Sequence, residues 1–109
     1  MINNLQGLED SIREYSDYLE GIASSIVEDI RQEKNSADFM SSIIKFSENF
    51  IILQEGNLTF YKNSGMEILD LNNLNEILNE INLGLVNADY FLIADLFEYE
   101  IIPHLKLKF

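Results

Sequence analysis

The chain has 109 residues and carries 19 Asp and Glu against 7 Lys and Arg, which gives a formal net charge of -12 at pH 7. Such an anionic surface repels phosphate backbones and anionic lipid headgroups, so we expect neither nucleic acid nor a membrane as a partner. Cysteine is absent, which excludes disulfides, thiolate catalysis and zinc–thiolate sites and agrees with a reducing, cytoplasmic location.

The first predicted element is a long helix over about residues 4–33. Its apolar residues recur at alternating steps of three and four, which places them on one stripe of an α-helix. They are Leu5, Leu8, Ile12, Tyr15, Leu19, Ile22 and Ile26. The other faces are acidic, and we expect them to face water. Gly7 and Gly21 occupy equivalent positions on this helix, where they could permit the close approach of a partner helix.

A second helix is predicted from residue 36 onward, because apolar residues again alternate by four and three. These residues are Phe39, Ile43, Phe46, Phe50 and Leu53, and Met40, Ile44 and Ile51 beside them broaden the apolar face. Gly56 and Asn57 either end this helix or lie inside it. The alternative is a pair of strands, 50–53 and 58–61, joined by a turn. We favour the helix, because a lone two-stranded hairpin is marginally stable.

Residues 63–65, Asn-Ser-Gly, give the clearest turn signal in the chain. A third helix is predicted after this turn, with Asp70 as a plausible N-cap and Gly84 as a plausible C-terminal stop. Its apolar positions are Leu71, Leu74, Ile77, Leu78 and Ile81. The spacing predicts a helix shorter than the first two.

A fourth helix is predicted over 90–102, with Asn87 as its cap and Asp89 in its first turn. Pro103 is expected to end it, because proline cannot donate to the preceding turn. The tail 104–109 is the only net-basic stretch. Two long helices followed by two shorter ones predict an all-α fold, an antiparallel helical bundle of about four helices in one domain, residues 1–109.

No catalytic or cofactor motif stands out in the sequence. His104 is the only histidine, and Pro103 disturbs the helical register that would align it with Glu100, so we expect no metal site. The glycines are isolated, so there is no phosphate-binding loop, and we expect no cofactor. Asp95 and Glu98 could form a carboxylate pair for acid–base chemistry. The favoured interpretation is that Asp95 accepts hydrogen bonds from a tyrosine or a backbone amide.

Residues 87–103 read N-A-D-Y-F-L-I-A-D-L-F-E-Y-E-I-I-P. This segment resembles the C-terminal signature D-Y-x-x-x-A-D-L-x-E-Y-E-x-x-P of a group of small, uncharacterised, acidic helical proteins of Gram-positive bacteria. The resemblance covers about 17 of the 109 residues. It implies a small helical protein of unknown function and supplies no catalytic residue.

The predicted fourth helix is apolar on nearly all sides, which indicates burial by several neighbours or by a second chain. Its candidate partner or dimer residues are Tyr90, Phe91, Ile93, Phe97 and Ile101. We therefore expect a protein partner or a homodimer, in which Lys106 and Lys108 could meet acidic residues of the other chain. The expected function is a non-enzymatic helical protein-interaction module, chaperone- or adaptor-like. The alternative is an acidic inhibitor or immunity protein that blocks a basic partner.

Overall fold

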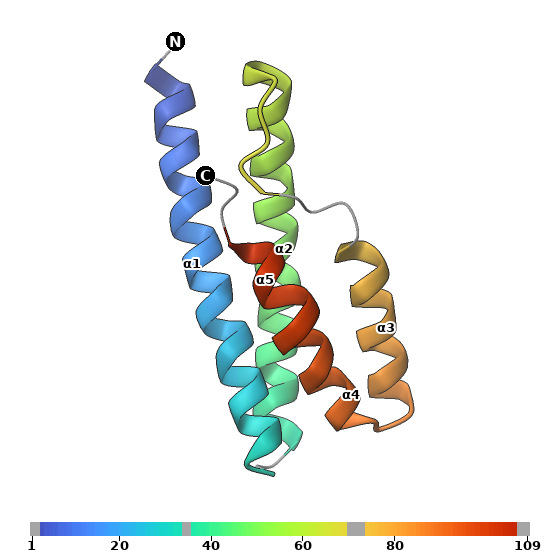
Figure 1. Ribbon diagram of the computed structural model, residues 1–109. Coiled ribbons are helices and arrows are strands. Elements are labelled where there is room, and N and C mark those ends of the chain that lie inside the picture. Colours follow the sequence, from blue (N-terminus) through green and yellow to red (C-terminus); the bar gives the residue numbers. More distant parts are fainter. Residues whose placement is uncertain (1–2, 34–35, 70–73, 107–109) are drawn as a thin grey trace.

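The computed structural model describes residues 3–33, 36–69 and 74–106. Every element in these parts of the chain is a helix, as the all-α prediction requires, and four helical stretches form a bundle (Figure 1). The first three stretches are α1 (Asn3–Arg31), α2 (Ser36–Ser64) and α3 (Leu74–Val86). The last stretch is continuous and consists of α4 (Tyr90–Asp95), the π-helical segment η1 (Leu96–Ile101) and α5 (Ile102–Leu105).

The two long helices lie antiparallel and in contact along the molecule (Figure 1). The predicted apolar stripe of the first helix faces inward, with Ile12, Leu19 and Ile26 buried. The helix ends close to the predicted position, and Glu33 follows it with a positive φ of 55°. A single periodic stripe was therefore sufficient to locate α1.

Residues 50–61 are helical, because α2 continues through Gly56 and Asn57 to Ser64. The alternative of two strands is wrong. The Asn57 side chain is buried and holds the backbone of Leu69, donating to its carbonyl at 3.1 Å and accepting from its amide at 3.3 Å. The chain thus turns back along α2 after Gly65, whose φ of +73° favours glycine and ends the helix where the turn was predicted.

The predicted ends of the shorter helices need correction. Asp70 lies outside the described residues, and Gly84 does not stop α3, which continues to Val86. A Cβ at Gly84 would lie 2.9 Å from Ile93 Cγ1, so this glycine permits the close approach of α3 and α4. The cap of α4 is Asp89 and not Asn87, because the Asp89 side chain accepts from the Leu92 amide at 3.3 Å.

The helical conformation also continues past Pro103, which was expected to end it. The π-helical segment η1 precedes the proline, and Pro103 occupies the first turn of α5. The Ile102 amide donates to the Phe97 carbonyl, five residues earlier, so the wider π-helical turn leads directly into the proline, which has no amide hydrogen to place. The chain remains helical to Leu105, whose carbonyl accepts a hydrogen bond from the buried Ser16 hydroxyl of α1.

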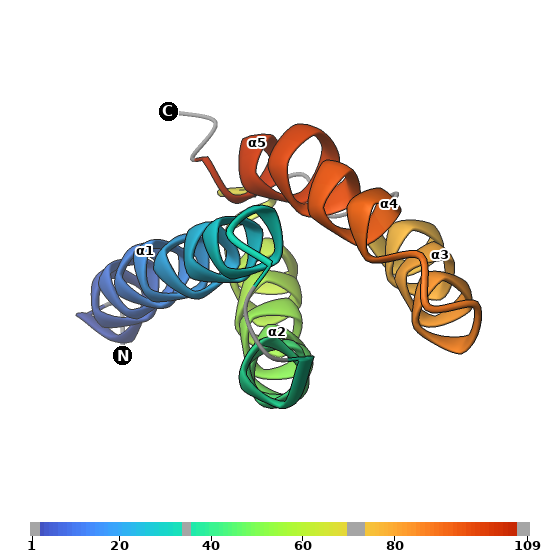
Figure 2. The same cartoon turned by 90° about the horizontal axis from the view of Figure 1, so that it is seen from below.

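The four stretches form an open arc in which the last stretch lies between α1 and α3 (Figure 2). It packs on α1 on one side and on α3 on the other. Large rings fill the space between α2 and the last stretch: the Phe46 and Phe97 rings meet edge to face with centroids 5.1 Å apart, as do those of Phe39 and Tyr90. No helix among the described residues is long and apolar enough to cross a membrane.

Candidate functional site

One of the hollows of the surface is a groove between α2 and α3. Its volume is about 330 Å³. The lining residues, which define the α2–α3 groove, are Ile43, Ser47, Phe50, Ile51, Gln54, Asn75, Leu78, Asn79, Ile81, Asn82 and Phe97. The groove is therefore assembled from three helical stretches that are distant in sequence.

The floor of the groove is apolar and closed. It is formed by Ile43, Phe50, Ile81 and Phe97, whose side chains are all buried in the core. The Phe46 ring stacks on Phe50 at 5.8 Å and meets Phe97 edge to face, which fixes two of the floor residues in place. A ligand in the groove would rest on a hydrophobic surface of buried side chains.

The walls are polar but uncharged. The α3 wall presents Asn75, Asn79 and Asn82, which are exposed and spaced by four and three residues so that they follow one side of the helix. The α2 wall presents Ser47 and Gln54, and the Gln54 amide donates to the Asn75 side-chain oxygen across the groove at 3.2 Å. None of the described residues that line the groove is ionisable, although the chain carries a net charge of -12.

A row of exposed aliphatic side chains follows α2 along the edge of the groove. We call these four residues, Met40, Ile44, Ile51 and Leu58, the α2 stripe. The last three are spaced by seven residues and are 57%, 56% and 53% exposed. The inner side of α2 is buried by the other helices, whereas this second apolar side is left exposed to solvent. The α2 stripe adjoins the groove through Ile51.

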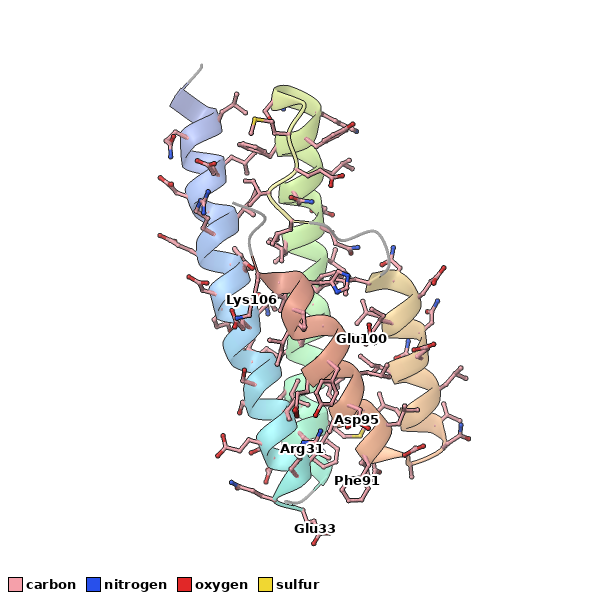
Figure 3. The ribbon with its side chains drawn as sticks, viewed as in Figure 1. Arg31, Glu33, Phe91, Asp95, Glu100 and Lys106 are labelled. Atoms are coloured by element: carbon pink, nitrogen blue, oxygen red, sulfur yellow. The ribbon has the colours of Figure 1, made fainter. Side chains whose placement is uncertain are left out.

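The structure separates the five residues that the sequence analysis assigned to a partner interface. Phe91 is 60% exposed and projects from the end of α4 (Figure 3), and Tyr90 is half-buried against Phe39. Ile93, Phe97 and Ile101 are at most 1% exposed. The expectation that these three form a surface for another chain is wrong, because α1, α2 and α3 of the same chain already cover them.

The carboxylates of Asp95 and Glu98 both bind the guanidinium of Arg31, at the end of α1, at 2.9 and 3.0 Å (Figure 3). The hydrogen bond that Arg31 donates to Asp95, followed by those it donates to Glu98, raises the pKa of Arg31 above its ordinary value. A hydrogen bond to Glu98 likewise raises the pKa of the Tyr99 hydroxyl. The expected hydrogen bond from a tyrosine or an amide to Asp95 is replaced by this ion pair, which joins the last stretch to α1.

The basic tail also binds within the chain. Lys106 forms an ion pair with Glu20 of α1 at 2.9 Å, within the same chain and not with a partner as expected. Lys108 lies outside the described residues. His104 Nδ1 lies 2.6 Å from the Glu100 carbonyl oxygen. Among the described residues, no three His, Asp or Glu side chains are arranged to hold a metal ion.

Sequence reasoning did not single out the α2–α3 groove. Two signals could have indicated it: the seven-residue spacing of Ile44, Ile51 and Leu58, and the asparagine row on the third helix. Both were present as patterns along one helix, whereas the groove depends on how far α2 and α3 stand apart. The aromatic contacts beneath the groove join α2 to the last stretch, which in turn packs on α3.

Residues 8–107 match a family model described as a domain of unknown function, DUF8042. The match takes in α2, α3 and the last stretch completely, and therefore includes every residue of the α2–α3 groove. No curated protein and no solved structure matches the chain.

Proposed function

We propose that this chain, which belongs to the DUF8042 family of domains of unknown function, is a non-enzymatic protein-interaction module. The α2–α3 groove and the adjoining α2 stripe would hold an apolar segment of a partner protein. The observation that carries the proposal is the combination of an uncharged groove with a closed aromatic floor and a row of exposed aliphatic side chains beside it. Exposed apolar surface of this kind marks binding sites on soluble proteins.

The chemistry of the groove walls supports a polypeptide as the ligand. Side-chain amides both donate and accept hydrogen bonds, so Asn79 and Asn82 can satisfy polar groups of a bound chain while its apolar side chains rest on the floor. The hydrogen bond between Gln54 and Asn75 exchanges readily for bonds to a ligand, since both groups are exposed. Among the described residues, the groove is lined by no Asp, Glu, His, Lys or Cys, so the Ser47 hydroxyl there has no lining base that could activate it.

A non-enzymatic role is further supported by the arrangement at Asp95 and Glu98, the only carboxylate pair that the sequence singled out for acid–base chemistry. Both carboxylates are engaged by Arg31 on the surface. General acid–base catalysis needs two groups in different environments within a pocket. Here both carboxylates pair with one surface guanidinium, and neither of them lines the α2–α3 groove. The cytoplasmic location expected from the lack of cysteine stays a prediction.

The proposal is tested by placing a photo-crosslinking residue at position 51 or at position 52 and irradiating cells of the source organism. Ile51 lines the groove, whereas its neighbour Ile52 is similarly exposed, at 48%, but does not line it. We expect a protein adduct from position 51 and none from position 52. Absence of an adduct at position 51 would contradict the proposal, and equal adducts at both positions would indicate collision without a site.

The alternative function, an acidic inhibitor that blocks a basic partner, predicts a different response to salt. Attraction by net charge is screened at high ionic strength, where the Debye length falls to about 3 Å at 1 M salt. Binding that depends on the apolar groove is retained there, because hydrophobic burial does not need unscreened charge. Complete dissociation of the adduct-forming partner at about 1 M salt would therefore favour the inhibitor.

A further inference from the structure

The geometry points to one class of occupant for the α2–α3 groove: an amphipathic α-helix of a partner protein that carries Lys or Arg along the flank facing α2. This inference rests on the proposed function and adds the chemistry of the partner. It is carried by the spacing of the α2 stripe, by two carboxylates beside it and by the neutral wall on the other side of the groove.

A helical occupant follows from the spacing of the α2 stripe. Ile44, Ile51 and Leu58 recur every seven residues, which is the repeat of a seam between two α-helices. Ser47 and Gln54 stand three residues after Ile44 and Ile51, where a helical partner meets the second row of such a seam, and both residues line the groove. The opposite wall, α3, has 13 residues and is about 20 Å long. A helix of similar length fits against it.

The charge on the occupant follows from Glu48 and Glu55. Each stands four residues after a member of the α2 stripe, on the outer side of the seam, and each is exposed. Within the described parts of the chain, neither carboxylate forms an ion pair. Residues at this position of a helical seam pair with residues that flank the apolar stripe of the partner helix. Lys or Arg on that flank is therefore the complementary choice.

The α3 wall fixes which flank is basic. Asn75, Asn79 and Asn82 are neutral, and they offer donors and acceptors but no charge. Glu76 and Glu80 of α3 are exposed but do not line the groove. The part of the occupant that meets these asparagines is therefore polar, and the flank that faces Glu48 and Glu55 is basic. This asymmetry sets the rotation of the occupant helix in the groove.

A second copy of this chain is a poorer occupant. Two α2 helices placed together would bring the same pair of carboxylates, Glu48 and Glu55, to both flanks of the seam. Each copy also carries a net charge of -12, which opposes association at low salt. A basic partner helix has neither problem.

The test uses the full-length chain and synthetic helical peptides of about three heptads. The first peptide has Leu on one face and Lys along one flank, and the second has Glu in place of Lys. The third has the composition of the first with the Leu residues distributed around the helix. Binding is followed at physiological salt by NMR of methyl groups. We expect the first peptide to shift the signals of Ile51 and Leu78 and to bind about tenfold or more tightly than the other two.

Matched variants then locate the site. Ile51→Glu is expected to weaken the Lys-flanked peptide by about tenfold, because it places a charge in the apolar seam. Ile52→Glu adds the same charge outside the groove and is expected to change binding by less than about twofold. Combining Glu48→Lys with Glu55→Lys is expected to reverse the preference toward the Glu-flanked peptide. All four positions are exposed, so the variants keep the core intact.

Three results would overturn the inference. They are equal binding of the first and third peptides, equal binding of the Lys- and Glu-flanked peptides, or a mass of twice 12.6 kDa for the isolated chain that Ile51→Glu returns to the monomer value. The last result would identify a second copy as the occupant. If position 51 forms adducts in cells while the Lys-flanked peptide fails to bind, the proposed function stands and only the occupant class is wrong.

Discussion

At the scale of single residues, the surface of the last stretch is organised around Arg31. Its guanidinium binds Asp95 and Glu98 together, and Glu98 also accepts from the Tyr99 hydroxyl. Exposed pairs of this kind contribute little to stability individually, because water and salt screen them. They instead fix the position of the last stretch on the end of α1, close to where the chain enters α2.

The Tyr99 contact predicts a specific response to alkaline pH. The hydrogen bond to Glu98 raises the pKa of Tyr99 above its ordinary value of 10.0, since ionisation would place two negative charges together. Because the pKa is raised in the folded state, the contribution to stability is present below pH 10.0 and is lost as the pH rises through the raised pKa. Comparison of ultraviolet tyrosinate titrations of the wild type and Tyr99→Phe isolates this group.

Glu98→Gln is the control for that titration. Without the carboxylate, the pKa of Tyr99 is expected to fall back toward its ordinary value. The titration step that Tyr99→Phe removes should therefore lie at lower pH in the Glu98→Gln background than in the wild type. If Glu98→Gln leaves the tyrosine titration unchanged, the contact with Glu98 does not set this pKa.

Two leucines of the last stretch give a matched pair for stability. Leu96 is 7% exposed, whereas Leu92, four residues earlier, is 41% exposed. We expect Leu96→Ala to lower the free energy of unfolding by about 2–5 kcal/mol, the range for a buried leucine. Leu92→Ala is expected to lower it by about 0.5 kcal/mol or less, as for surface positions. Urea denaturation of both variants measures the difference, and equal losses would contradict the burial of Leu96.

At the scale of elements, the packing of α3 depends on the glycine that was expected to end it. Gly84 lies inside the helix and faces Ile93 of α4, whose side chain is completely buried. By contrast, no atom lies within 4 Å of a Cβ built at Gly7 or Gly21 of α1. These two glycines therefore do not provide a close approach within the chain, and only Gly84 has that role in α3 and α4.

The same substitution should have opposite effects at Gly84 and Gly21. Ala at Gly21 is expected to raise the free energy of unfolding by about 0.5–1 kcal/mol, because alanine favours the helix and no neighbour is displaced. Ala at Gly84 places its Cβ against Ile93 and is expected to cost about 1–3 kcal/mol, which exceeds the gain in helix propensity. Thermal and urea denaturation measure both values. A stabilised Gly84→Ala variant would show that α3 and α4 can separate freely.

At the scale of the whole molecule, the net negative charge disfavours the folded state, and the elongated shape reduces the repulsion between its charges. The chain is elongated, with extents of 48 × 21 × 21 Å, which spreads its negative charge over a large surface. Self-repulsion of a net charge of -12 nevertheless opposes folding. The ion pairs of Arg31 and Lys106 oppose that repulsion locally and join the last stretch to α1.

This balance predicts that added sodium chloride stabilises the protein. Between about 0.01 M and about 0.15 M salt the Debye length falls from about 30 Å to about 8 Å, which screens repulsion across the surface. Acidic residues outnumber basic ones by 19 to 7, so the loss of repulsion outweighs the weakening of the ion pairs. We expect the melting temperature to rise with salt, and to rise more steeply in Arg31→Gln, which has one attractive centre fewer. A melting temperature that falls with salt would contradict this prediction.

The sequence by itself determined that the chain is helical and which face of each long helix is buried. Periods of three and four residues located α1 and α2, and an Asn-Ser-Gly turn located the end of α2, because these signals depend on local backbone and side-chain preferences. The sequence also identified the carboxylates at 95 and 98 as unusual, but not Arg31 as their partner, which lies 64 residues away from Asp95. Ile93, Phe97 and Ile101 looked available for a second chain for the same reason: a pattern along one helix does not say which neighbour covers it.

Only the tertiary structure decided where the chain leaves apolar surface uncovered. Gly84 lets α3 approach α4 closely, and the rings of Phe46 and Phe97 meet between α2 and the last stretch. The α2–α3 groove lies beside these two contacts, since its lining comes from α2, α3 and Phe97. Both depend on side chains that meet across the core from segments remote in sequence, and no single-helix pattern contains that information.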